Sequence, residues 1–137
     1  MCKIKNNCFT FLFLLSCFVF NSCSDYSTNL GDGYTFVHEG ENWNYIFHGL
    51  PSEGGEITPN VMSFDYDRNF IIAKQKPMPF QYGYETGEEY ENRVDTIPVC
   101  YWLIIKKEHK TLGPMDYDSF QRHRKQYKVP DKLVIER

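Results

Sequence analysis

The chain has 137 residues, close to the commonest size of a single domain, with 15 basic and 18 acidic side chains. Its formal net charge of −3 at pH 7 argues against a nucleic-acid partner, because binding to phosphates needs a basic surface. A chain of this length is large enough for one hydrophobic core and too small for two.

The N-terminal segment has the layout of a secretory signal. Lys3 and Lys5 supply positive charge, residues 8–20 form an apolar run, and a short polar approach leads to Cys23. The run is shorter than the roughly 20 apolar residues that span a bilayer. A cysteine at the cut point is typical of bacterial lipoproteins, so we expect lipid attachment at Cys23. The alternative is an ordinary secretory signal with a coincidental cysteine.

This interpretation divides the chain into three parts. We expect a lipoprotein signal peptide over 1–22, a lipidated cysteine and polar tether over 23–32, and a single domain over 33–137. Removal of the signal peptide would take away Lys3 and Lys5 and change the formal net charge from −3 to −5. Cys100 is then the only cysteine in the folded part, so packing must hold the domain together without an internal disulfide.

Alternating apolar and polar residues predict two hairpins in the first half of the domain. A short helix over 42–48 is an alternative for one of these strands, and residues 50–60 contain prolines and glycines that predict a loop. The turn at 67–69 contains Asp and Asn, which tolerate the backbone conformations of a tight hairpin. The strands are expected over 33–39, 42–48, 61–66 and 70–76.

Residues 77–96 differ from the rest because prolines, glycines, tyrosines and carboxylates collect there. A connection of this length without regular structure is usually functional or mobile. Tyrosine contributes well to interfaces, so an acidic and aromatic contact surface is possible, with a solvated loop as the alternative. The residues expected to contact a partner are Tyr82, Tyr84, Glu88, Glu89 and Tyr90.

The last third predicts a strand, a turn and a helix. Residues 97–106 are apolar on both faces, which indicates a central strand covered on both sides. We expect a return strand that Pro114 stops, a helix with Asp116 as its N-cap that ends at Pro130, and an edge strand over 132–137. The predicted class is α+β: a mostly antiparallel sheet of four to six strands with one C-terminal helix packed on a face, preceded by the signal segment.

Two stretches carry a resemblance to a known family. They are SFDYDRNFIIAKQKP at 63–77 and YWLIIKKEHKTLGPMDYDSFQRHRKQYKVP at 101–130. Together they resemble an uncharacterised family of small lipoproteins and related domains of unknown function from Bacteroides-like bacteria. In that family a DYD…FIIAKQ hairpin precedes a YWII…GP…F…R strand–turn–helix module. The resemblance implies a location and a fold, and it implies no catalytic residues.

Possible metal sites are weakly supported. Asp65, Asp67 and Asn69 match the opening of a calcium loop, but Phe70 stands where the glycine should be, so a solvated hairpin turn is the better interpretation. The histidines show no ligand spacing that suggests zinc. His38 and His48 could meet across neighbouring strands, although a third ligand would be missing. The four histidines are His38, His48, His109 and His123.

Catalytic groups are equally sparse. Cys100 lies among apolar neighbours, which raise the pKa of a thiol, so a packed core cysteine is favoured over a nucleophile. No Ser-His-Asp order, glycine-rich phosphate loop or paired-carboxylate spacing is evident. We therefore expect no enzymatic activity, no cofactor and no bound metal.

The sequence predicts an uncharacterised cell-envelope protein that is held at a membrane, expected to be the outer membrane, by its N-terminal lipid. The domain is expected to bind an envelope protein through a sheet edge or through residues 78–96. The alternative is a module that binds a glycan or a small molecule, motivated by Trp43, Tyr45 and Trp102, and an enzyme is the least supported class. The ligand, the exposed side of the membrane and the oligomeric state stay open.

Overall fold

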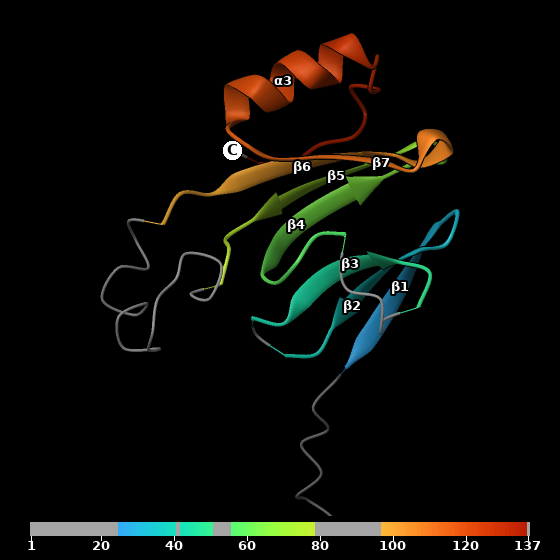
Figure 1. Ribbon diagram of the computed structural model, residues 1–137, viewed down its shortest axis with the longest axis vertical. Coiled ribbons are helices and arrows are strands. Elements are labelled where there is room, and N and C mark those ends of the chain that lie inside the picture. Colours follow the sequence, from blue (N-terminus) through green and yellow to red (C-terminus); the bar gives the residue numbers. More distant parts are fainter. Residues whose placement is uncertain (1–24, 41, 51–55, 79–96, 137) are drawn as a thin grey trace, which may run out of the picture.

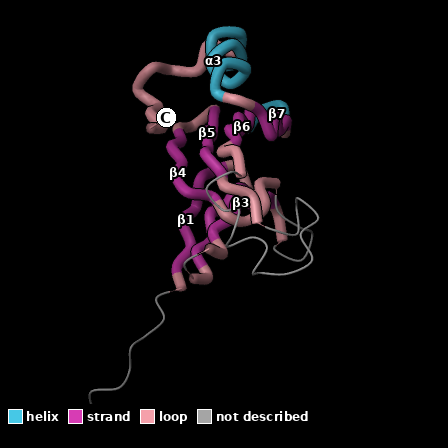
Figure 2. Tube along the Cα trace, turned by 90° about the vertical axis from the view of Figure 1, so that its left-hand side faces the viewer, coloured by secondary structure: helices cyan, strands magenta, loops and turns pink. Residues whose placement is uncertain are grey.

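The computed structural model describes residues 25–40, 42–50, 56–78 and 97–136. These residues form three layers (Figure 1). A three-stranded sheet, called sheet A, packs on one face of a four-stranded sheet, called sheet B, and a helix covers the other face of sheet B. The same order of layers is visible after a quarter turn (Figure 2).

Sheet A contains β1 (Tyr26–Gly31), β2 (Tyr34–His38) and β3 (Asn44–His48), in that order and antiparallel throughout. The predicted strands over 33–39 and 42–48 are confirmed, and the helical alternative for 42–48 is wrong.

The first strand corrects the expected boundary of the tether. Residues 26–31 lie inside the range 23–32 that was predicted as tether, but they pair with β2 along their length. Most β1 side chains are exposed, which explains the polar composition, while Leu30 is buried in the core. The folded domain therefore begins no later than Tyr26.

Sheet B contains four antiparallel strands in chain order. The predicted hairpin over 61–76 is confirmed, and the expected coverage of β6 on both faces is confirmed too. Trp102 and Ile104 face sheet A, whereas Leu103 and its neighbours along that face pack toward the helix. The strands are β4 (Val61–Tyr66), β5 (Phe70–Gln75), β6 (Cys100–Ile105) and β7 (Lys110–Met115).

The C-terminal region follows the prediction in part. The helix α3 (Tyr117–Gln126) begins where expected, because the Asp116 side chain accepts a hydrogen bond of 2.7 Å from the backbone N–H of Ser119. The expected stop at Pro114 is wrong, since β7 continues to Met115. β7 is an edge strand of sheet B, where the missing N–H of a proline costs no ladder hydrogen bond.

The predicted edge strand over 132–137 is also wrong for the described residues 132–136, which pair with no strand. Leu133 and Ile135 are buried beneath α3, and the backbone N–H of Val134 donates to a carboxylate oxygen of Asp65 at 2.9 Å. The apolar alternation that predicted a strand reflects this packing.

Two apolar clusters fill the spaces between the layers. The α+β class, with a C-terminal helix packed on a sheet face, is confirmed, and the strands are divided between two sheets. The cluster between the sheets contains Leu30, Tyr34, Phe36, Ile46, Ile57, Val61, Ile71, Ala73 and Ile104. The cluster between sheet B and the C-terminal region contains Ile72, Tyr101, Leu103, Ile105, Phe120, Val129, Leu133 and Ile135.

A buried lysine connects the two sheets. Lys106 opens the short 3-10 helix η4 (Lys106–Glu108) after β6, and only 1% of its surface is exposed. Its ammonium group donates to the carbonyl of Leu30 in β1 and, at 2.6 Å, to the carbonyl of Asp67 in the β4–β5 turn. The ammonium also lies 5.4 Å from the centre of the Tyr66 ring. Burial lowers the pKa of Lys106, an effect that the nearby carboxylates only partly oppose.

Substitution of this lysine should loosen the contact between the sheets. We predict that Lys106→Ala lowers the free energy of unfolding by about 2 kcal/mol or more, because the two carbonyl groups lose their donor and stay buried. The exposed neighbour allows a matched control, Lys107→Ala, expected to change stability by less than about 0.5 kcal/mol. Urea denaturation followed by tryptophan fluorescence measures both. Equal stabilities of the two variants would show that the lysine does not connect the sheets.

Candidate interaction surface

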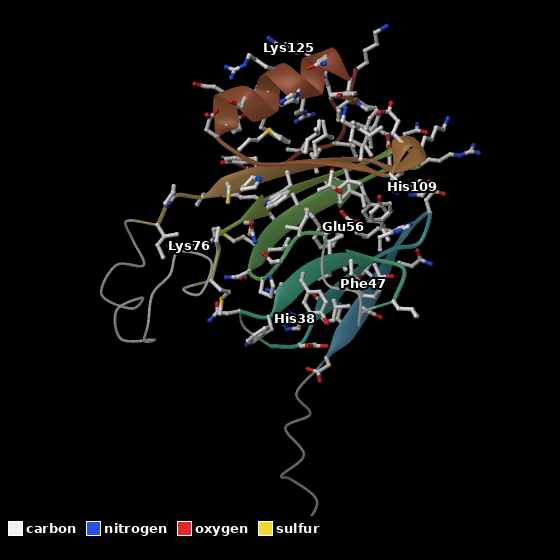
Figure 3. The ribbon with its side chains drawn as sticks, in the orientation of Figure 1. His38, Phe47, Glu56, Lys76, His109 and Lys125 are labelled. Carbon is white, nitrogen blue, oxygen red and sulfur yellow. The ribbon has the colours of Figure 1, made fainter. Side chains whose placement is uncertain are left out.

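One end of sheet A brings together exposed aromatic and polar side chains. The register places Tyr26 opposite His38 and His38 opposite Asn44, so the three side chains form a row across the sheet. The rings of Tyr26 and His38 stack with centroids 4.9 Å apart, and Nδ1 of His38 donates to Oδ1 of Asn44. Figure 3 shows His38 at the lower end of the molecule, far from α3.

Further side chains join this row through hydrogen bonds. The Asn44 amide donates to Oδ1 of Asn60 at 3.5 Å, and the Asn60 amide donates to Oδ1 of Asn42 at 3.3 Å. On β3, the hydroxyl of Tyr45 donates to Glu39 at 3.0 Å. Burial and the contact with this carboxylate raise the pKa of Tyr45.

A shallow depression of about 450 Å³ lies beside the row. Tyr26 is 54% exposed and Trp43, in the β2–β3 turn, is 50% exposed. Aromatic faces next to amide and carboxylate groups can stack on a partner and exchange hydrogen bonds with it. We call the depression together with Trp43 the tether-end surface. The depression is lined by Asp25, Tyr26, Ser27, Val37, His38 and Glu39.

The opposite end of sheet A contains a second aromatic cluster. The buried ring of Tyr34 lies 4.5 Å from that of His48, which in turn lies 5.0 Å from His109 in the β6–β7 turn. Burial, followed by the charges of Glu56 and Asp32, raises the pKa of Tyr34. Among the described residues, no three His, Cys, Asp or Glu side chains gather in a way that could hold a metal ion.

His38 and His48, which could have met across neighbouring strands, do not meet. Strand pairing places His38 opposite Asn44 and His48 opposite Tyr34, at the two ends of the same hairpin. Figure 3 shows His109 at the end of the molecule away from His38. The sequence could not reveal the His48–His109 contact, because it joins two different sheets.

Cys100 is buried, so its interpretation as a packed core cysteine is confirmed. It also belongs to a buried polar network. Its sulfur lies 3.6 Å from Oε1 of Gln75, which also accepts a hydrogen bond of 2.8 Å from the Trp102 indole. The Gln75 amide donates to the Thr58 carbonyl at 2.7 Å. Burial raises the pKa of Cys100 to about 11, which keeps the thiol protonated at neutral pH. Trp102 is likewise engaged in this network.

Asp67 in the β4–β5 turn stabilises the turn itself, as the hairpin interpretation predicted, whereas Asp65 lies within β4. A carboxylate oxygen of Asp67 accepts hydrogen bonds from the backbone N–H groups of Asn69 and Phe70, at 2.8 and 3.0 Å. Burial acts to raise the pKa of Asp67, but these two hydrogen bonds and the nearby Lys132 lower it overall.

Several predicted site residues lie outside the described residues, namely Cys23, Tyr82, Tyr84, Glu88, Glu89 and Tyr90. The structure does define which elements precede and follow the segment that contains the tyrosines and glutamates of this list, because β5 and β6 pair antiparallel as far as Gln75 and Cys100. Residues 76–99 therefore join two neighbouring strands. The tether-end surface was not predicted, since its first residues were assigned to the tether.

The chain belongs to the family described as "Protein of unknown function (DUF3997)", whose model matches residues 31–137. The comparison with curated proteins found no match, and neither did the comparison with solved structures. The family establishes an uncharacterised domain. None of the helices in the described ranges has the length and apolar character that crossing a bilayer requires.

The buried thiol predicts a pH dependence of stability. The pKa of Cys100 rises from 9.0 to about 11 in the folded protein, so the unfolded chain releases its proton first. The contribution of the thiol to the free energy of unfolding is therefore complete below about pH 9 and is lost as the pH rises through about 11. The loss amounts to roughly 2–3 kcal/mol at most.

The comparison between the parent protein and Cys100→Ala isolates this contribution, because both proteins keep Tyr34 and Tyr45, whose pKa values are also raised. The free energy of unfolding, measured by denaturation at several values between pH 8 and pH 11, should decrease more steeply with pH for the parent protein than for the variant. Parallel curves would contradict the assignment.

Proposed function

We propose that this protein is a lipid-anchored component of the cell envelope whose domain binds another envelope protein and catalyses no reaction. The observation that carries the proposal is the layout of residues 1–23, with a positive start, an apolar run and a cysteine at the cut point. We place the anchored protein at the outer membrane. The family match is compatible with the proposal and assigns no activity.

Two segments are candidates for the contact with a partner. Residues 79–96 combine tyrosines with carboxylates, a composition suited to protein contact. The second segment is the outer edge of sheet A, because β1 is the first strand of the order β1-β2-β3 and most of its residues are exposed. An exposed sheet edge can accept a strand from another protein. At the other edge of sheet A, Ile57 pairs with Ile46 of β3.

Binding is favoured over catalysis by the way the reactive groups are used. The thiol of Cys100 and the ammonium of Lys106 are both buried and hydrogen-bonded to the protein itself. A nucleophile or a general base must instead reach its substrate.

Glycan binding is a second candidate. Trp43 favours it, because its ring is half-exposed and its neighbours in the sequence, Asn42 and Asn44, carry amide groups. Tyr45 and Trp102 support it less, since the first donates to Glu39 and the second to the buried Gln75. A glycan array probed with the detergent-solubilised protein tests this candidate, and the absence of binding to any glycan would argue against it. Glycan binding that survives Trp43→Ala would show that Trp43 is not the contact.

The lipid anchor is tested by substitution of the modified residue. We predict that Cys23→Ala stops incorporation of a fatty-acid analogue and releases the protein from membranes, because no other thiol stands at the cut point. Cys17→Ala is the matched control, since it removes a cysteine within the apolar run and should leave labelling unchanged. Unchanged labelling of the Cys23→Ala protein would refute the anchor.

The role of the acidic and aromatic segment is tested by its removal. We predict that replacing residues 79–96 with a short glycine–serine linker leaves the thermal midpoint nearly unchanged, because β5 and β6 pair along their whole length and the cost of closing a loop depends only weakly on its length. The same replacement should abolish capture of the envelope partner. A triple alanine variant of Tyr82, Tyr84 and Tyr90 keeps the segment length and should weaken capture as well. If capture survives both changes, the contact lies elsewhere.

A further inference from the structure

The position of β1 limits how far the domain can stand from a membrane. Cys23 precedes Tyr26 by three residues, and β1 begins at Tyr26. An extended chain advances at most about 3.6 Å per residue, so three residues span no more than about 11 Å. The headgroup region of one leaflet is roughly 5–8 Å thick. A lipid on Cys23 would therefore hold the start of β1 at the headgroup layer.

The same geometry selects which end of the domain meets the membrane. Strand pairing places the start of β1 beside the end of β2 and the start of β3, through the row of Tyr26, His38 and Asn44. The β2–β3 turn therefore lies at this end too. Figures 1 and 2 both show the start of β1 at the end of the molecule opposite α3.

The exposed side chains at this end suit an interface between water and lipid. Trp43 and Tyr26 are about half-exposed, and tryptophan and tyrosine are the residues enriched at the headgroup level. Asp25 and Glu39 lie at the same end and are exposed. Their charges favour contact at the hydrated headgroup depth over insertion into the hydrocarbon core.

We propose that the tether-end surface rests on the headgroup layer of the bilayer, with Trp43 and Tyr26 in contact with lipid and α3 directed away from the membrane. The proposal rests on the lipid anchor described above. It adds an orientation that the anchor alone would not impose, because a tether of ten residues would let the domain rotate freely at a distance of up to about 35 Å. In this orientation the basic side chains of α3, such as Lys125 in Figure 3, face the aqueous phase.

Tryptophan fluorescence tests the orientation on the full lipidated protein. The protein is reconstituted into phosphatidylcholine vesicles that contain lipids brominated either near the headgroup or at the chain ends. Bromine near the headgroup should reduce the emission more than bromine at the chain ends, because Trp43 lies at headgroup depth. The only other tryptophan, Trp102, donates to the buried Gln75 and should be quenched little.

Trp43→Phe is the matched control, since it keeps an aromatic ring and the backbone hydrogen bonds of the turn. This variant should lose the headgroup-dependent quenching while its unfolding transition stays in place. A second measurement uses acrylamide, a water-soluble quencher. Acrylamide should quench Trp43 of the parent protein less in vesicles without brominated lipid than in detergent solution.

Flotation of the vesicles separates the two possible failures. A protein that does not float with the vesicles lacks the anchor, and both proposals then fail. A protein that floats but shows no bromine quenching of Trp43, or full access of acrylamide to it, keeps its anchor and overturns the orientation. That second outcome would leave the tether-end surface open to a soluble partner.

Discussion

One buried ammonium group determines how the two sheets of this domain meet. Lys106 follows the central strand of sheet B and donates to a carbonyl at the end of β1 and to another in the β4–β5 turn. A charge is costly to bury, so it is tolerated only where hydrogen bonds replace its water. The position of β1 relative to sheet B is therefore specified by a polar contact as well as by apolar packing, and the tether-end surface depends on that position.

Sheet B separates the two apolar clusters and contributes side chains to both. The alternation of β6 sends Trp102 and Ile104 toward sheet A and Leu103 toward α3, so a single strand contributes to both clusters. Gly113 of β7 shows how closely this wall is packed, because an added Cβ there would lie 2.6 Å from the Trp102 ring.

Most of the fold could be predicted where a segment had a clear period. The strands β2 to β5 follow from alternation, β6 follows from its apolar run and the cap of α3 follows from Asp116, all of which are local signals. β1 was missed because Ser27 and Asn29 face solvent and only Leu30 is fully buried, so its six residues carry little apolar pattern. The tether-end surface was missed with it. Contacts between sheets, such as that of His48 with His109, leave no signal in a single sequence.

Cys100 gives the domain a natural reporter of its own opening. If Cys23 carries a lipid and residues 1–22 are removed, as proposed above, Cys100 is the single free thiol. Because this thiol is buried beside Gln75, separation of β5 and β6 at this end would expose it to an alkylating reagent. The rate of alkylation thus records how often this end of the β5–β6 pair opens, without any label being introduced.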